Sequence, residues 1–295
     1  MRNDFAAFIL THGRPDKVMT YWSLRDAGYT GRLYLVVDDE DPTADLYRTR
    51  FGAENVLQFS KSEIERRIDT CDNFGNRSCI LHARNACWDL AAEVGVRYFI
   101  QLDDDYNSWF YRFDEEGRYR ATRIRRTMDD LLAALLDLFE AVPALTVALS
   151  QGGDHIGGAS PQRLRRKAMN SFICDVQRPF QFSGTLNEDV TTYTTLGRRG
   201  HLFLTVMAAQ LNQQATQAGE GGISDLYRKL GTYAKAFYSV MSCPSSVRVG
   251  VLGDPGRKAG ASVGVAHYRI HHAVDWNRTA ACILREKHRK GIGCA

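Results

Sequence analysis

The sequence predicts an α/β fold in which helices flank a mostly parallel sheet, and three observations support this prediction. Short apolar runs alternate with stretches whose apolar residues recur at helical spacing. Each apolar run ends in a polar loop, and ligands of such sheets bind beyond the carboxyl ends of the strands. A length of 295 residues with 44% apolar content is enough for a large core. We therefore expect a single domain over 1–295, with halves at 1–150 and 151–295.

The first half is expected to alternate strands and helices. Apolar runs predict strands over 5–10, 32–37, 55–59 and 98–102. Amphipathic stretches predict helices over 17–27, 43–51 and 80–94. Polar turns separate these elements, and the alternation is typical of strand–helix–strand units with parallel strands.

The second half has a less regular pattern. Leucines at helical spacing predict a helix over 128–139, which Pro143 ends, and 146–150 is expected to be a strand. Glycines predict a flexible loop at 152–158, before a basic segment at 163–167 and an aromatic stretch at 172–182. We expect 202–238 to be an interrupted helical region and the glycine-rich segment 250–264 to be a mobile loop.

Composition restricts the classes of protein to consider. The formal charge of +4 and the pI near 8.6 permit an anionic partner without requiring one. The seven cysteines are odd in number and form no CxxC pair, so we expect reduced thiols. The apolar run at 5–10 is too short for a signal peptide or a membrane span. These features predict a soluble cytoplasmic protein with no membrane partner.

Three consecutive carboxylates follow the expected strand at 98–102. A divalent ion with oxygen ligands needs one or two carboxylates plus substrate phosphates, and strand geometry sends Asp103 and Asp105 to the same side. The run Asp103-Asp104-Asp105 therefore indicates a metal that bridges a diphosphate. A solvated acidic turn or a set of helix caps is the alternative.

A second acidic motif, Asn187-Glu188-Asp189, opens an amphipathic segment. Such a pair can supply a general base that deprotonates a hydroxyl group. The alternative is an ordinary helix N-terminus, since Asn187 suits a cap and Glu188 and Asp189 suit the helix dipole. The two roles are compatible.

A histidine cluster lies near the C-terminal end of the sequence. One imidazole of His267, His271 or His272 can complete the metal site that the aspartates begin, and which of the three does so stays open. Structural histidines are the alternative.

Taken in order, these motifs resemble the core of GT-A glycosyltransferases, which have a Rossmann-like sheet. The resemblance implies that Asp105 and His267 hold Mn²⁺ or Mg²⁺ and that Asp103, beside the metal, faces the sugar or ribose of a UDP-sugar. It implies that Asp189, with Glu188 beside it, is the base of an inverting reaction. The nucleotide sugar would bind to 1–150 and the acceptor to 151–295.

Other polar residues stand where such enzymes line the donor pocket. These candidates follow the first two strands, precede the acidic run or lie within it: Thr11, Gly13, Arg14, Asp38, Asp39, Arg84, Asn85 and Asp104. Each has an ordinary turn or helix-surface role as its alternative.

The segments 98–106, 169–172 and 183–191 further resemble the TET-associated glycosyltransferases of bacteriophages. That resemblance implies an acceptor in phage DNA, the hydroxymethyl group of 5-hydroxymethylcytosine. The basic segments 123–126, 163–167 and 285–290 would then contact phosphates, unless they are solvated faces or nucleotide contacts. For the enzyme to reach this hydroxymethyl group, the nucleotide is expected to flip out of the duplex, with an aromatic residue stacking in its place. The candidates are Trp109, Phe110, Phe180 and Phe182, with core positions as the alternative.

Other functions remain open at this point. The acceptor of the same reaction could be a polysaccharide, a lipid or a protein. A nucleotidyltransferase would need a glycine-rich, lysine-bearing loop after the first strand, where 11–17 has only Gly13. A non-catalytic DNA-binding module of the same fold is disfavoured, because its unpaired carboxylates would repel phosphate.

Overall fold

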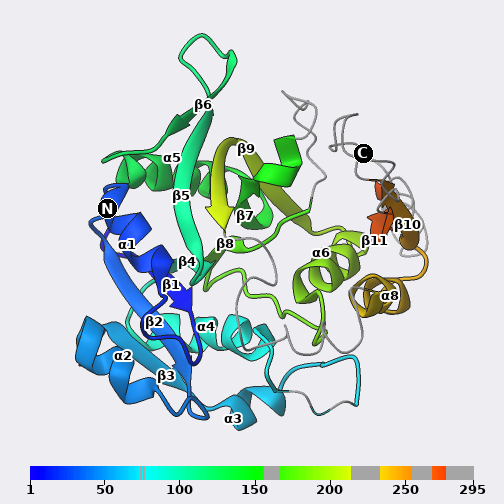
Figure 1. The fold of residues 1–295 in the computed structure, drawn as a ribbon, viewed down its shortest axis with the longest axis horizontal. Helices are drawn as coiled ribbons and strands as arrows, with labels where there is room; N and C mark the ends of the chain where they lie inside the picture. Colours follow the sequence, from blue (N-terminus) through cyan, green and yellow to red (C-terminus); the bar gives the residue numbers. More distant parts are fainter. Residues whose placement is uncertain (74, 76, 156–166, 214–232, 254–267, 277–295) are drawn as a thin grey trace, which may run out of the picture.

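The computed structural model describes residues 1–73, 75, 77–155, 167–213, 233–253 and 268–276. Most of the described chain forms a nine-stranded sheet in the order β3-β2-β1-β4-β8-β7-β9-β5-β6, with helices against it (Figure 1). The elements are, in chain order, β1 (Phe5–Leu10), α1 (Met19–Asp26), β2 (Arg32–Asp38), α2 (Ala44–Phe51), η1 (Ala53–Asn55), β3 (Val56–Phe59), α3 (Lys61–Glu65), α4 (Leu81–Glu93), β4 (Tyr98–Asp103), β5 (Tyr106–Phe113), β6 (Tyr119–Arg123), α5 (Met128–Ala141), β7 (Ala144–Gln151), η2 (Gly152–His155), β8 (Ser171–Asp175), α6 (Glu188–Arg198), β9 (Leu202–Gln213), α8 (Tyr233–Ser242), β10 (Val247–Gly253) and β11 (Tyr268–Val274).

Four parallel strands from the first half determine where the site lies. β1 pairs with β2 on one side and with β4 on the other, and Leu10 is in register with both Val36 and Asp103. Because parallel strands end at the same edge, the residues after these strands come together there. The predicted α/β fold with a largely parallel first half is confirmed.

The core fills both faces of this sheet. Alternate β1 residues point to opposite faces. One set, Phe5, Ala7 and Ile9, packs in a cluster with residues of α1, α2 and α5. The other set packs in a second cluster with residues of α4 and α6. Burial on both faces explains why these strands are continuous apolar runs.

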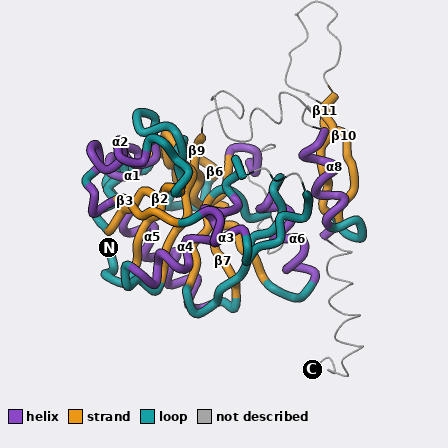
Figure 2. Tube along the Cα trace, turned by 90° about the horizontal axis from the view of Figure 1, so that it is seen from below, coloured by secondary structure: helices purple, strands orange, loops and turns teal. Residues whose placement is uncertain are grey.

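Strands from the second half extend the sheet with mixed directions. β4 pairs antiparallel with β8, and β7 pairs parallel with β9. The hairpin of β5 and β6 completes the sheet, and β6 is its edge strand. Outside this sheet, β10 and β11 form a separate antiparallel pair beside α8 (Figure 2).

Two expectations for the second half are wrong where the structure describes them. Residues 202–213 form β9 rather than a helix, because burial alternates along Phe203, Thr205 and Met207 with the period of a strand. The start of 250–264 belongs to β10 rather than to a loop. Residues 233–238 of the first segment belong to the helix α8, as expected. Residues 214–232 of the first segment and 254–264 of the second lie outside the described ranges.

Two further features concern thiols and membranes. The five cysteines in the described ranges form no disulfide in the structure. No helix in the part of the chain that the structure describes is long and apolar enough to cross a membrane.

Candidate active site

Asp104 is fixed against the loop that follows β1. Its carboxylate accepts a hydrogen bond of 2.7 Å from the Thr11 hydroxyl and pairs with Arg14 at 3.2 Å. The Tyr47 hydroxyl lies 2.9 Å from the Thr11 hydroxyl and accepts a hydrogen bond from the Arg14 backbone amide. The structure therefore joins three candidate donor-pocket residues, Thr11, Arg14 and Asp104, around one buried carboxylate.

Arg84 joins the two acidic motifs. Its side chain is 1% exposed on α4, and it donates from Nη2 to Asp103 and from Nε to Glu188, each at 2.9 Å. Its guanidinium also lies over the Phe172 ring. Burial alone would lower the pKa of Arg84, but the two carboxylates outweigh burial and raise it. Arg84 is thus a charged link between the end of β4 and the start of α6.

The motif Asn187-Glu188-Asp189 lies at the start of α6, so the predicted helix start is confirmed, but the Asn187 side chain makes no capping hydrogen bond to the helix. Asn187 has the left-handed conformation with φ 52°, and its amide donates to the Lys235 carbonyl and the Ser239 hydroxyl, each at 2.8 Å. These bonds attach the turn to α8. The Asn187 amide also lies 3.5 Å from Nδ1 of His272. Of the histidine cluster, His272 therefore lies beside the turn at Asn187 that begins the second acidic motif.

Glu188 and Asp189 have different surroundings within this turn. Burial and repulsion from Asp189 raise the pKa of Glu188, while Arg84 opposes that rise. Asp189 is 6% exposed, and its Oδ1 accepts a hydrogen bond from the Val190 amide. Glu188 is therefore committed to Arg84, whereas Asp189 is not paired with a cation in the described contacts.

Asp105 differs from its two neighbours because one of its oxygens is buried without a hydrogen-bond partner among the described residues. Burial, with repulsion from Asp103 and Asp104, raises its pKa to about 7. A buried carboxylate oxygen left unpaired is costly unless a cation or donor satisfies it.

This orphaned oxygen fits a divalent ion held mostly by a diphosphate. Such an ion needs only one or two carboxylates from the protein. No three His, Cys, Asp or Glu side chains form a metal centre within the described ranges. Arg14 and Thr11 hold Asp104, and Arg84 holds one oxygen of Asp103. The expected ligand His267 lies outside the described residues.

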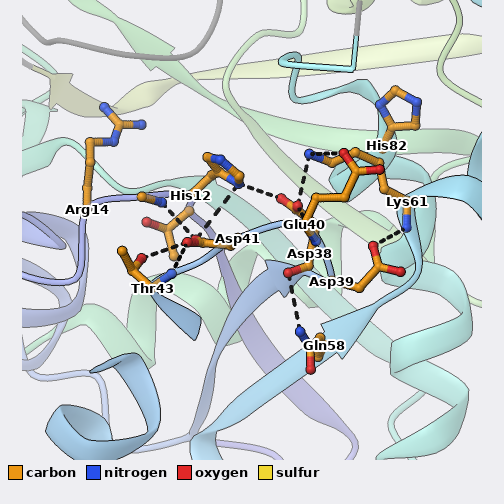
Figure 3. Close-up of polar contacts among 12 residues, drawn as sticks. His12, Arg14, Asp38, Asp39, Glu40, Asp41, Thr43, Gln58, Lys61 and His82 are labelled. Carbon is orange, nitrogen blue, oxygen red and sulfur yellow. Dashed lines mark hydrogen bonds and ion pairs between the residues drawn. The ribbon is translucent and has the colours of Figure 1, made fainter. Parts of the chain in front are cut away.

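A second charged cluster lies beyond β1, β2 and β3 (Figure 3). The Asp38 carboxylate is 2.7 Å from Nδ1 of His12 and 2.9 Å from Nζ of Lys61, which is 5% exposed. Burial would raise the pKa of Asp38, but the hydrogen bonds from His12 and Lys61 lower it to about 2. The contact with Asp38 raises the pKa of His12. The cluster places a buried lysine and a histidine beside a predicted donor-pocket residue.

The loop after β2 is held by further contacts in the same view (Figure 3). Asp41 accepts hydrogen bonds from the Gly13 amide at 2.7 Å and from the Thr43 amide at 2.8 Å. Asp39 accepts one at 2.9 Å from the Lys61 amide. The candidates Gly13, Asp38 and Asp39 therefore belong to one bonded network.

Sequence reasoning missed His12 and Lys61 in this network. Both follow strand ends, since His12 comes two residues after β1 and Lys61 two residues after β3. Their position after strand ends is the one feature of the sequence that points to them, because neither residue belongs to a recognisable motif. Their roles become visible only when the sheet brings the three strand ends together.

Replacing Asp38 by asparagine should destabilise the fold at neutral pH and matter less in acid. The change leaves Lys61 buried without its nearest carboxylate, which should cost about 3 kcal/mol of unfolding free energy. Because the folded pKa is lowered, the stabilisation by Asp38 is complete above pH ~4 and is lost as pH falls towards 2. Urea unfolding from pH 7 to pH 2.5 tests this, with Asp45→Asn at an exposed position as the control. If the difference in unfolding free energy between Asp38→Asn and the unmodified protein is constant from pH 7 to pH 2.5, ionised Asp38 does not stabilise the fold in this way.

The remaining candidates have mainly structural surroundings. Asn85 accepts from the Phe182 amide at 2.9 Å and donates to the Phe182 carbonyl at 3.0 Å, so it fixes the segment before the second motif. Of the proposed stacking aromatics, Trp109 and Phe182 lie in the core, while Phe110 and Phe180 are half-buried. Arg123, Arg125 and Arg126 are exposed. The segments 163–166 and 285–290 and the loop residues 156–158 lie outside the described ranges.

The chain belongs to the TET-associated glycosyltransferase family, whose model matches residues 5–222. It is therefore an enzyme that transfers a glycosyl group. The resemblance seen in the sequence is confirmed at this level. No curated protein matches the chain.

Several solved structures are similar to this chain in fold. One is glucosyl-3-phosphoglycerate synthase from Mycobacterium tuberculosis in complex with Mg²⁺ and UDP, with 12% identity, a TM-score of 0.42, and 92% of this chain and 87% of that chain covered. Another is the mannosyltransferase PcManGT from Pyrobaculum calidifontis in complex with GDP-Man and Mn²⁺, with 11% identity, a TM-score of 0.43 and coverage of 83% and 73%. A third is S. aureus TarS 1-349 with UDP-GlcNAc, with 10% identity, a TM-score of 0.40 and coverage of 76% and 63%. Likeness at this level does not identify the donor or the metal of this chain.

Proposed function

We propose that this glycosyltransferase moves a sugar from a UDP-sugar to the hydroxymethyl group of 5-hydroxymethylcytosine in phage DNA, assisted by Mn²⁺ or Mg²⁺. The observation that carries the proposal is the Arg84 link, which holds the acidic run after β4 beside the acidic turn of α6. Donor and acceptor chemistry need such proximity, because the base must act where the sugar leaves the diphosphate.

The donor is assigned to the edge formed by β1, β2 and β4. The Arg14 guanidinium suits the diphosphate, and Asp38 and Asp39 suit the ribose or base. Asp103 lies at the end of β4, where it can face the sugar. These roles rest on position at the strand ends and on the polar groups gathered there.

Asp105, and Asp103 through the oxygen that Arg84 does not bind, would hold the divalent ion, with His267 as the further ligand that the family resemblance suggests. When bound, the ion neutralises the charge that develops on the diphosphate leaving group. Arg84 keeps Asp103 in place, and Thr11 with Arg14 keeps Asp104 in place.

Asp189 is proposed as the general base. It would take the proton from the acceptor hydroxyl as that oxygen bonds to the anomeric carbon and the diphosphate leaves, with inversion. Asp189 has no cation partner in the described contacts, and Glu188 is held by Arg84 beside it. Glu188 therefore supports the turn electrostatically rather than competing for the proton.

Replacing Asp189 by asparagine should lower kcat about 10²- to 10⁴-fold, which is the usual contribution of a general base. The Oδ1 contact with the Val190 amide can be kept by an amide oxygen, so the fold should be preserved. Transfer rates and circular dichroism check this, with Asp137→Asn on the exposed face of α5 as the control. An unchanged kcat would show that Asp189 is not the general base.

The acceptor and donor can be tested together. The purified protein is incubated with Mn²⁺, a panel of UDP-sugars and duplex DNA that contains 5-hydroxymethylcytosine, and nucleosides are analysed by mass spectrometry. Addition of one hexose or N-acetylhexosamine to the modified nucleoside supports the proposal. UDP release from one donor without modified DNA would reject the DNA acceptor and favour a polysaccharide, lipid or protein. Unmodified cytosine DNA is the matched control.

A further inference from the structure

An open groove on the α1 side of the molecule has no role in the chemistry described above. It has a volume of about 490 Å³ and is lined by Met19, Trp22, Ser23, Arg25, Asp26 and Asn107. Trp22 is 56% exposed, which is unusual for so large an apolar side chain. Its ring is packed against Tyr21 and Phe51 at centroid distances of 4.9 and 6.2 Å. The exposed tryptophan is therefore held in place rather than free to turn.

The groove begins beside the acidic run. The Thr20 hydroxyl of α1 donates to the Asp103 carbonyl at 2.6 Å and accepts from the Tyr106 amide at 2.9 Å. The Thr20 amide donates to the Asp104 carbonyl at 3.1 Å. Asn107 lies two residues after Asp105 and lines the groove. These contacts hold α1, whose residues line the groove, against the loop that carries Asp105.

Arginines lie at the other end of the groove. Arg123 of β6 pairs with the groove residue Asp26 at 3.7 Å. The backbone of Arg126 lies directly against Gly28, where an added Cβ would meet its Cα at 2.3 Å. Arg120 and Arg125 are also exposed on this edge. The sheet edge thus adds an exposed basic strip to the aromatic groove.

The acidic groups near this strip are largely matched. Asp114 and Glu116 at the tip of the β5–β6 hairpin pair with Arg118, each at 2.8 to 2.9 Å. Asp26 is shared with Arg123, and Glu115 is exposed at the tip. Arg125 makes no ion pair within the described part of the chain. The charge of Arg125 is therefore available to an anionic partner along this edge.

We propose that the groove and the β6 edge bind the DNA strand that flanks the modified nucleotide. Trp22 stacks on a base that is exposed when the duplex is opened, and Arg120, Arg123 and Arg125 contact the phosphates that follow. A fixed aromatic face beside a basic track is the combination that proteins use for unpaired nucleic acid, whereas a neutral glycan gives arginines no charge to neutralise. This inference rests on the proposed DNA acceptor and adds where that DNA lies.

Two variants test the surface, and both leave the donor site intact. Trp22→Ala should weaken binding of a fluorescein-labelled 5-hydroxymethylcytosine oligonucleotide about 10-fold. The triple variant Arg120→Ser, Arg123→Ser, Arg125→Ser should reduce the slope of log K against log salt by about 2, because phosphate contacts are lost. Both should raise KM for DNA while UDP-sugar hydrolysis without acceptor stays unchanged. The charge-matched control is Arg48→Ser, Arg66→Ser, Arg199→Ser, at positions outside the groove and the β6 edge.

The outcomes separate this inference from the function on which it rests. If both variants bind DNA with the affinity and salt dependence of the unmodified protein, the proposed DNA-binding surface is rejected. Transfer of sugar to DNA by the unmodified protein would still support the proposed function. If the unmodified protein neither binds nor glycosylates the oligonucleotide, the DNA acceptor fails and the surface fails with it. If the control triple variant binds the oligonucleotide as weakly as the test triple variant, the proposed surface is also rejected. The loss of affinity would then come from total charge and not from the position of the arginines.

Discussion

Replacing Asp105 by alanine should abolish metal-dependent transfer while leaving the fold intact. One oxygen of this carboxylate is buried and accepts no hydrogen bond from the described residues, so removing that oxygen leaves no described donor without its acceptor. Charge stabilisation by a metal is worth several kcal/mol, and losing it should lower kcat on the order of 10³-fold or more. Transfer rates measured across a Mn²⁺ titration check this result.

Stability provides the second half of that test. The unfolding free energy of Asp105→Ala should match or exceed that of the unmodified protein, because burial and like charges already disfavour the ionised group. Asp137→Ala, at an exposed position on α5, is the control for the loss of one carboxylate. Retained metal-dependent activity in Asp105→Ala would reject the metal assignment.

Replacing Arg84 by methionine should both destabilise the protein and inactivate it. Removing one partner of a buried ion pair leaves the others unpaired, and this typically costs about 3 to 5 kcal/mol. Asp103 and Glu188 would then repel each other across the site. Urea unfolding and transfer rates measure the two effects, and kcat should fall further than stability alone explains at a temperature where the variant is folded.

A double-mutant cycle distinguishes a specific link from general core disruption. Arg84→Met and Glu188→Gln should be non-additive by about 1 to 3 kcal/mol, because the second change removes a charge that the first leaves unpaired. Arg84→Lys should not restore activity fully, since an ammonium cannot present the planar fork that reaches both carboxylates. Additive effects in the cycle would show that Arg84 and Glu188 act independently.

The parallel half of the fold could be predicted from the sequence because its signals are local. Strands buried on both faces are continuous apolar runs, and the expected strand at 5–10 matches β1 residue for residue. The acidic run at the end of β4 and the helix start at Glu188 were also visible locally. Position at strand ends was therefore enough to nominate most of the site.

The contacts that organise the site could not be predicted in the same way. Arg84 and Glu188 are 104 positions apart in the chain, and no periodicity links them. His12 and Lys61 belong to separate strand ends and meet only through Asp38. The strand β9 was mistaken for a helix because its apolar residues are too dense for a clear period. Long-range pairing decides all three cases.

The Arg84 link also constrains how enzymes of this type can be recombined. A chimera that exchanges 151–295 for the corresponding part of another enzyme would cut the β4–β8 pairing and replace the carboxylate that Arg84 holds. The introduced part must therefore have an acidic residue at the position of Glu188, or Arg84 must be replaced as well. If the two halves bind donor and acceptor as proposed, they share this ionic contact, so specificity for a new acceptor is more safely introduced by altering the outer surface than by exchanging halves.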